Sequence, residues 1–219
     1  MSTVSDVLKN LVKDLVEGLQ TEVSPALNSM TKISIGTASH EAGHAILAWC
    51  CTHVPSVKKV QMITPIYGLT THDFAEPISH DGAWGLIVIM LAGLAGEGLA
   101  TMSYTVKGSE SDLLAARALA ERLALEGKAR DMPWGPIEKD ATRTDIAALY
   151  KDRPTGATAE ILNLCYRKAR QVIKARRAVL DRLSVELSAR GFVDEAGLEQ
   201  IFGKRLVYKL CAGKRPIFV

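Results

Sequence analysis

The sequence predicts a mainly α-helical protein with a small β-hairpin or short sheet. Apolar residues make up 47% of the 219 positions and aromatic residues only 5%, so aliphatic residues that favour helices, such as Ala and Leu, dominate. Several segments repeat apolar residues at helical spacing, whereas residues 57–63 alternate and contain β-branched side chains. Charged residues make up 23%, as in folded chains, and the length allows one large domain or two small ones.

An amphipathic helix is expected over residues 4–19, with Ser5 and Asp6 as caps. Ser24-Pro25 ends it, and a linker follows. We expect this helix to pack on the domain or on another copy of the chain, which would give a homo-oligomer. The first residues have no basic stretch leading into an apolar run, so no secretory signal is expected. The predicted division is residues 1–34 for this helix and linker, 35–203 for the main domain and 204–219 for a C-terminal tail.

The main domain begins with a predicted helix over residues 37–52, for which Thr37 is the expected N-cap. A strand over Val57–Ile63 follows, then a turn marked by Pro65 and Gly68. Residues 69–72 are expected to pair back as the second strand of a hairpin.

An apolar helix is predicted from about residue 83 to residue 104. It has the length of a membrane span, but Glu97 and several glycines interrupt it. A buried core helix is the better interpretation, so we expect no membrane span.

Helices also dominate the predicted C-terminal half. Gly108 breaks the chain, and Ser109 or Ser111 caps a helix over residues 112–126. A loop over residues 127–141 and four further features are expected: a short helix over 145–151, a long amphipathic helix over 158–190 closed by Gly191, a short helix over 194–202, and a tail that folds back or dangles.

Charge and cysteine content narrow the function classes. The net charge of +3 is too small to indicate a nucleic-acid partner, and we interpret the basic residues between 167 and 182 as a solvated helix face. The four cysteines include no Cys-x-x-Cys pair and are too few for a disulfide scaffold. We interpret them as reduced residues of a cytoplasmic protein.

The strongest chemical signal is His40-Glu41-Ala42-Gly43-His44, which lies in the first predicted helix of the domain. Residues four apart share one helix face, so His40 and His44 can direct two imidazoles at one metal ion. Glu41 projects nearby, where it can act as a general base toward a water molecule. The surrounding residues are apolar, and burial of these three groups without a shared partner would be costly.

A catalytic zinc site usually has three protein ligands, so a third is required. The candidates are His53, His72, His80, Glu97, Glu110 and Asp112. Glu97 lies inside an apolar helix, where a carboxylate without a partner is costly. Asp112 lies at the start of a helix that follows a turn. Sequence spacing alone does not indicate whether Glu97 or Asp112 is the third ligand.

These motifs resemble the peptidase domain of the FtsH-type AAA+ zinc metalloproteases. The segments that carry the resemblance are Ala38–Ala45, Val57–Val60, Leu69–Thr71, Leu91–Leu99 and Gly108–Leu113. The resemblance covers about residues 35–203. It implies a helical zinc-peptidase domain with Asp112 as the third zinc ligand and Glu97 as an acid that orients a ligand or closes the site. Leu94, Gly98 and Ser111 depart from the family pattern, and the loop after His72 follows it loosely.

The expected activity is therefore that of a zinc-dependent metalloendopeptidase acting on unfolded or short polypeptides. Zn²⁺ is the expected cofactor, with Glu41 as the catalytic residue. The family carries an ATPase module, but no Gly-x-x-x-x-Gly-Lys-Ser/Thr loop occurs in these 219 residues. Two alternatives are a peptidase subunit that depends on a separate ATPase and an inactive zinc-binding scaffold. The presence of Glu41 argues against the scaffold, which has no need of a general base.

Overall fold

The computed structural model describes residues 35–76, 78–103, 108–134, 137, 145–205 and 217–218. The helix predicted over residues 4–19 lies outside this part of the chain. The elements are α2 (Ile35–Cys50), β1 (Val57–Thr64), β2 (Tyr67–His72), α3 (His80–Thr101), α4 (Glu110–Leu125), the 3₁₀ turn η2 (Ile146–Leu149), α5 (Gly156–Ala175), α6 (Arg177–Arg190), β3 (Phe192–Asp194) and α7 (Glu195–Phe202). The predicted fold class, mainly α with a short sheet, is confirmed.

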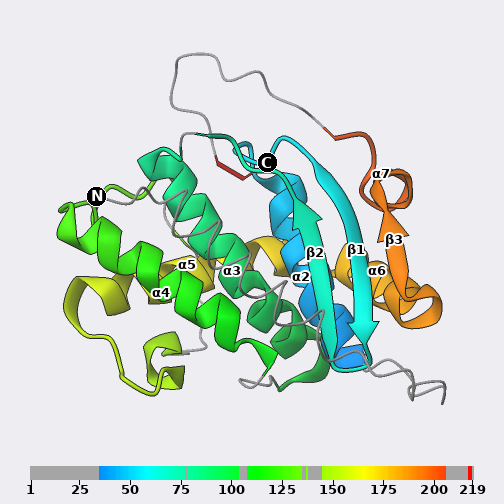
Figure 1. Ribbon diagram of the computed structural model, residues 1–219, viewed down its shortest axis with the longest axis horizontal. Coiled ribbons are helices and arrows are strands. Elements are labelled where there is room, and N and C mark those ends of the chain that lie inside the picture. The colour runs from blue at the N-terminus through cyan, green and yellow to red at the C-terminus, as the bar shows by residue number, and fades with distance from the viewer. Residues whose placement is uncertain are drawn as a thin grey trace, which may run out of the picture.

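Helices α2 and α3 form the centre of the fold (Figure 1). α2 contacts α3 on one side and α6, β1 and β2 on others, while α3 also contacts α4 and α5. Small residues allow α2 and α3 to approach closely: a Cβ added to Gly43 would lie within 3 Å of the main chain of Ala92, and one added to Gly96 would clash with the carbonyl oxygen of Ser39. The two backbones are therefore in direct contact.

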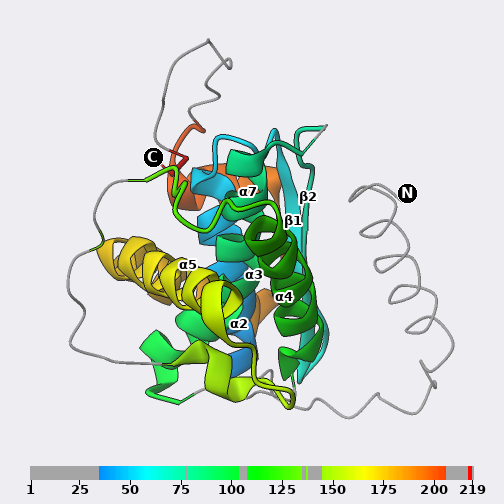
Figure 2. The same ribbon diagram turned by 90° about the vertical axis from the view of Figure 1, so that its left-hand side faces the viewer.

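The long helix α3 is apolar enough, by length and composition, to cross a membrane, but 72% of its most apolar 18-residue window is buried inside the protein. α4 and α5 cover it, as Figure 2 shows from the side. Trp84, Leu91 and Leu94 are among its completely buried side chains. Packing against other helices thus accounts for its apolar composition, as predicted for a core helix.

The sheet has the order β2-β1-β3, and both pairings are antiparallel. Val60 of β1 pairs with Thr70 of β2 on one side and with Val193 of β3 on the other. The predicted hairpin is confirmed, although its turn is Pro65-Ile66 and Gly68 lies within β2. β3 was not predicted, because it has only three residues. β1 is thus the central strand, and β2 is an edge strand.

Two other predictions are wrong. α2 begins at Ile35, so Thr37 lies inside the helix and is not its N-cap. Residues 158–190 form two helices, α5 and α6, which change direction at Arg176 (φ −117°, ψ 32°). No Gly or Pro marks this break. α5 packs on α3 and α6 packs on α2, so the bend lets both helices bury their apolar faces.

The C-terminal residues that the structure describes return to the end of α2. The backbone N–H of Thr52 donates to the carbonyl of Ile217 (2.8 Å), and Ile217 is buried. The guanidinium of Arg205 donates to the carbonyls of Ala48, Trp49, Cys51 and Val54. This part of the tail therefore folds back onto the domain.

Candidate metal centre and active site

His40 and His44 lie one turn apart in the buried central part of α2. Their Nε2 atoms are 3.0 Å apart, and their rings meet edge to face. Such close approach of two imidazole nitrogens follows from the i, i+4 spacing on one helix face. The two nitrogens thus point to one place.

Asp112 comes to the same place from the first turn of α4. Its Oδ2 lies 3.1 Å from Nε2 of His40 and 3.3 Å from Nε2 of His44. These three residues can hold a metal ion, since one ligand atom from each lies within 4.8 Å of the others. The Asp112 side chain is 25% exposed, which leaves the cluster accessible from one side.

The structure places the other ligand candidates elsewhere. Glu97 approaches His40 from the opposite ring nitrogen, with Oε2 3.8 Å from Nδ1. His80 pairs with Glu126, His72 contacts the carbonyl of Asp73, and His53 stacks on Phe74. Within the described residues, Asp112 is therefore the acid that joins the two Nε2 atoms.

The outward-facing ring nitrogens also have partners. Nδ1 of His44 donates to the carbonyl of Ile89 on α3 (2.8 Å), so Nε2 is the nitrogen that can bind a metal when the ring is neutral. Nδ1 of His40 faces the buried Ser109 hydroxyl at 3.5 Å as well as Glu97. Both rings are thus held in the orientation that directs Nε2 inward.

Glu41 is buried between α2 and β2. The Thr70 hydroxyl lies 2.9 Å from its Oε2 and 3.1 Å from its main-chain carbonyl. A Cβ added to Gly68, two residues earlier on β2, would lie within 3 Å of the Glu41 side chain. β2 therefore fits closely over this carboxylate.

The charged groups of this cluster shift one another's pKa values. Burial alone would lower the pKa of His40, but hydrogen bonds to Asp112 and Glu97 and the charges of Asp112 and Glu41 raise it to about 10. Burial would likewise lower the pKa of His44, but the charge of Asp112 and a hydrogen bond to it raise it. Burial would raise the pKa of Asp112, but the neighbouring imidazoles hold it well below its usual range. Burial raises the pKa of Glu41, and the imidazoles and Thr70 offset part of this shift.

These residues fit a zinc ion by their chemistry. Three carboxylates, Glu41, Glu97 and Asp112, lie near two imidazoles in a largely buried space, and such a concentration of negative charge requires compensation. Protons on the histidines supply that compensation in the metal-free protein. Two histidine nitrogens and one carboxylate oxygen form a ligand set that catalytic zinc sites use, with a position left for water.

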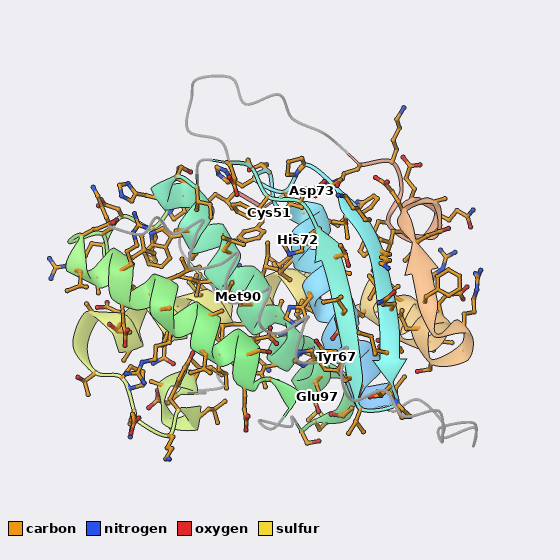
Figure 3. The ribbon with its side chains drawn as sticks, in the orientation of Figure 1. Cys51, Tyr67, His72, Asp73, Met90 and Glu97 are labelled. Carbon is orange, nitrogen blue, oxygen red and sulfur yellow. The ribbon has the colours of Figure 1, made fainter. Side chains whose placement is uncertain are left out.

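Several residues around the site carried no sequence signal of their own. Ser109 appeared as a helix cap, yet it makes no side-chain capping bond and faces His40 instead. Gly93 lies against the His40 ring, which a Cβ there would meet within 3 Å. Tyr67 begins β2 toward the same end of the fold as Glu97 (Figure 3), and burial, then the charges of Glu41 and Asp112, raise its pKa. The tertiary structure shows how each of these residues meets the site.

Comparisons with known proteins point to the same chemistry at low similarity. The chain is 26% identical over 190 residues to "ATP-dependent zinc metalloprotease FtsH" of Acidothermus cellulolyticus and 28% identical over 188 residues to "ATP-dependent zinc metalloprotease FtsH 4" of Sorangium cellulosum. These matches cover 76% and 77% of this chain, but only 27% and 29% of the two relatives. No protein-family model matches the chain. The chain is thus distantly similar to zinc metalloproteases over about three quarters of its length.

Proposed function

We propose that this protein is a zinc-dependent peptidase that hydrolyses peptide bonds in unfolded or short polypeptides. The observation that carries the proposal is the meeting of His40, His44 and Asp112 beside the buried Glu41. The similarity to zinc metalloproteases supports the same reaction class. In this proposal the first three residues hold zinc and Glu41 is the catalytic residue.

In the proposed reaction, the zinc ion and the side chains of the protein have different roles. When bound, zinc supplies a Lewis acid that polarises a carbonyl and lowers the pKa of water. Glu41 accepts a proton as the water oxygen attacks the scissile carbonyl carbon, and it delivers that proton to the amine as the C–N bond breaks. Glu97 and Ser109 keep the His40 ring oriented.

An extended polypeptide fits the edge of the sheet. β1 is flanked on both sides, so it offers no free edge, whereas β2 has a strand partner on one side only among the residues that the structure describes. A peptide that pairs with β2 would lie next to the strand that covers Glu41. Such pairing uses main-chain hydrogen bonds and requires an unfolded segment, so we expect weak sequence selectivity.

A second arrangement has an ATPase on another chain delivering the substrate. Both relatives are named as ATP-dependent, and this chain spans less than a third of the length of either. Addition of a candidate ATPase with ATP would then raise the rate on folded substrates and leave the rate on short peptides unchanged.

The decisive test combines zinc content with activity. We expect about one zinc ion per chain by mass spectrometry, cleavage of casein or a fluorogenic peptide, and a loss of roughly 100- to 10,000-fold in the Glu41→Gln variant. Asp112→Ala should lose zinc. The exposed Glu110, in the same first turn as Asp112, provides the matched control Glu110→Gln. Wild-type protein without zinc, or equal activity in wild type and Glu41→Gln, would overturn the proposal.

A further inference from the structure

We propose that Thr70 is a positioning residue for the general base, holding the Glu41 carboxylate in its working orientation from the edge strand β2. This inference rests on the proposed peptidase function and concerns the same site. Thr70 is not one of the three residues that can hold the metal ion.

The first support is the hydrogen bond itself. The Thr70 hydroxyl lies 2.9 Å from Oε2 of Glu41, and this carboxylate is the acceptor. Within the described part of the chain, Thr70 is the side chain that donates to it. One oxygen of the carboxylate is thereby engaged, and the other remains available to accept a proton.

The second support is the geometry of β2. Successive side chains of a strand point to opposite faces, so Gly68 and Thr70 share the face toward α2. Gly68 leaves room for Cγ and the carboxyl group of Glu41, and Thr70 contacts the carboxylate. The strand thus fixes both the stem and the head of the Glu41 side chain.

The same hydroxyl also lies 3.1 Å from the Glu41 main-chain carbonyl, so Thr70 could serve only to attach β2 to α2. The two roles have different consequences. Loss of an attachment lowers stability and disturbs substrate binding at the β2 edge, which raises KM. Loss of a positioning contact lowers kcat, because the base is less often aligned in a folded, zinc-loaded protein.

The test uses the zinc-loaded full chain and three variants. Thr70→Val removes the hydroxyl and keeps the shape, Thr70→Ser keeps the hydroxyl, and Thr71→Val changes the next residue, which points to the other face of β2. We expect Thr70→Val to lower kcat about 10- to 100-fold with little change in KM or zinc content, and Thr70→Ser to restore most of it. An unchanged kcat in Thr70→Val, or a change confined to KM, would overturn the proposal. If Thr70→Val does not fold, Thr70→Ala takes its place.

A second readout does not depend on peptidase activity. The carboxyl carbon resonance of Glu41 is identified by its absence in Glu41→Gln, using protein with ¹³C-labelled glutamate. Removal of its hydrogen-bond donor should shift this resonance at fixed pH in Thr70→Val, but not in Thr71→Val. If the zinc-loaded wild type cleaves no peptide, the proposed function fails, and this resonance alone decides whether Thr70 holds Glu41. The same resonance position in wild type and Thr70→Val would refute the contact.

Discussion

We expect His40 to exchange a proton for the metal ion when zinc binds. Its pKa is raised to about 10, so it is protonated at pH 7 in the metal-free protein, whereas a metal ligand must be unprotonated. We therefore expect zinc binding at pH 7 to release at least one proton per ion and zinc affinity to fall as the pH is lowered. Calorimetry in two buffers of different ionisation enthalpy measures the proton count. Binding without proton release would contradict the assignment of His40.

The same shift affects the stability of the metal-free protein. Because the folded pKa lies above the ordinary value of 6.5, the His40 contribution is fully present below about pH 6.5. It is lost as the pH rises through about 10. Asp112→Ala removes a carboxylate that raises this pKa, so the pH-dependent stabilisation of the metal-free protein should be smaller in that variant.

Substitution of two glycines should disturb the general base Glu41 and the ligand His40 separately. Gly68→Ala would displace the end of the Glu41 side chain, so we expect zinc to remain bound while activity falls. Ala at Gly93 would push on the His40 ring, so zinc affinity should fall although Ala is the better helix former. Zinc titration and peptide cleavage measure the two effects. Gly108→Ala is the control, because a Cβ there meets nothing within 4 Å.

At the level of single residues, the sequence predicts only part of the site. His40, Glu41 and His44 are close in sequence, so helix geometry alone brings them together. Asp112 is 72 positions from His40, and spacing left it level with Glu97 until the fold placed each at a different ring nitrogen. Thr70 lies in a segment that resembles the family, but nothing in the sequence linked it to Glu41, because an ordinary strand threonine looks the same whether or not a carboxylate lies beneath it.

The C-terminal end of α2 depends on one side chain. Arg205 donates to four main-chain carbonyls there and lies over the Trp49 ring, 5.6 Å from its centroid. Helix ends leave carbonyls without partners inside the helix. The carbonyls of Ala48 and Cys51 also accept from the N–H groups of Cys51 and Val54, so Arg205 adds a second bond to each of them and supplies a donor to the carbonyls of Trp49 and Val54. We expect Arg205→Ala to lower the free energy of unfolding by about 2–3 kcal/mol.

Urea denaturation of the full chain measures this loss. Lys204→Ala, at the exposed neighbouring position, should change stability by no more than about 0.5 kcal/mol. Arg205 lies at the opposite end of α2 from His40, so zinc content should remain that of the wild type. Equal stabilities for the two variants would show that the Arg205 contacts contribute nothing net.

Element boundaries follow the sequence where local chemistry sets them. Gly191 ends α6 in the left-handed conformation (φ 77°), and Asp194 caps α7 by accepting from the Gly197 N–H, both as the residue types indicate. The bend at Arg176 and the pairing of β3 arise from contacts with α2 and β1, which no local pattern encodes. Tertiary packing explains both misses.

The assembly state of the whole molecule depends, in our interpretation, on residues 1–24. Their apolar positions follow one helix face: Val4, Leu8, Leu11, Val12, Leu15, Val16 and Leu19. We expect deletion of residues 1–24 to reduce the mass measured by light scattering to that of a smaller assembly, with zinc content unchanged. The same mass before and after deletion would exclude assembly through this helix.

The contact between Gly43 and the main chain of Ala92 has a consequence for how the protein can change. Main-chain atoms are the same size in every residue, so this contact sets a minimum separation of α2 and α3 that side chains elsewhere in the core do not shorten. The Ile89 carbonyl and Glu97, which hold the two histidines, are on α3 and keep their distances from α2. Core residues of α5 and α6 can therefore be exchanged for others of similar volume while the histidine geometry stays constant.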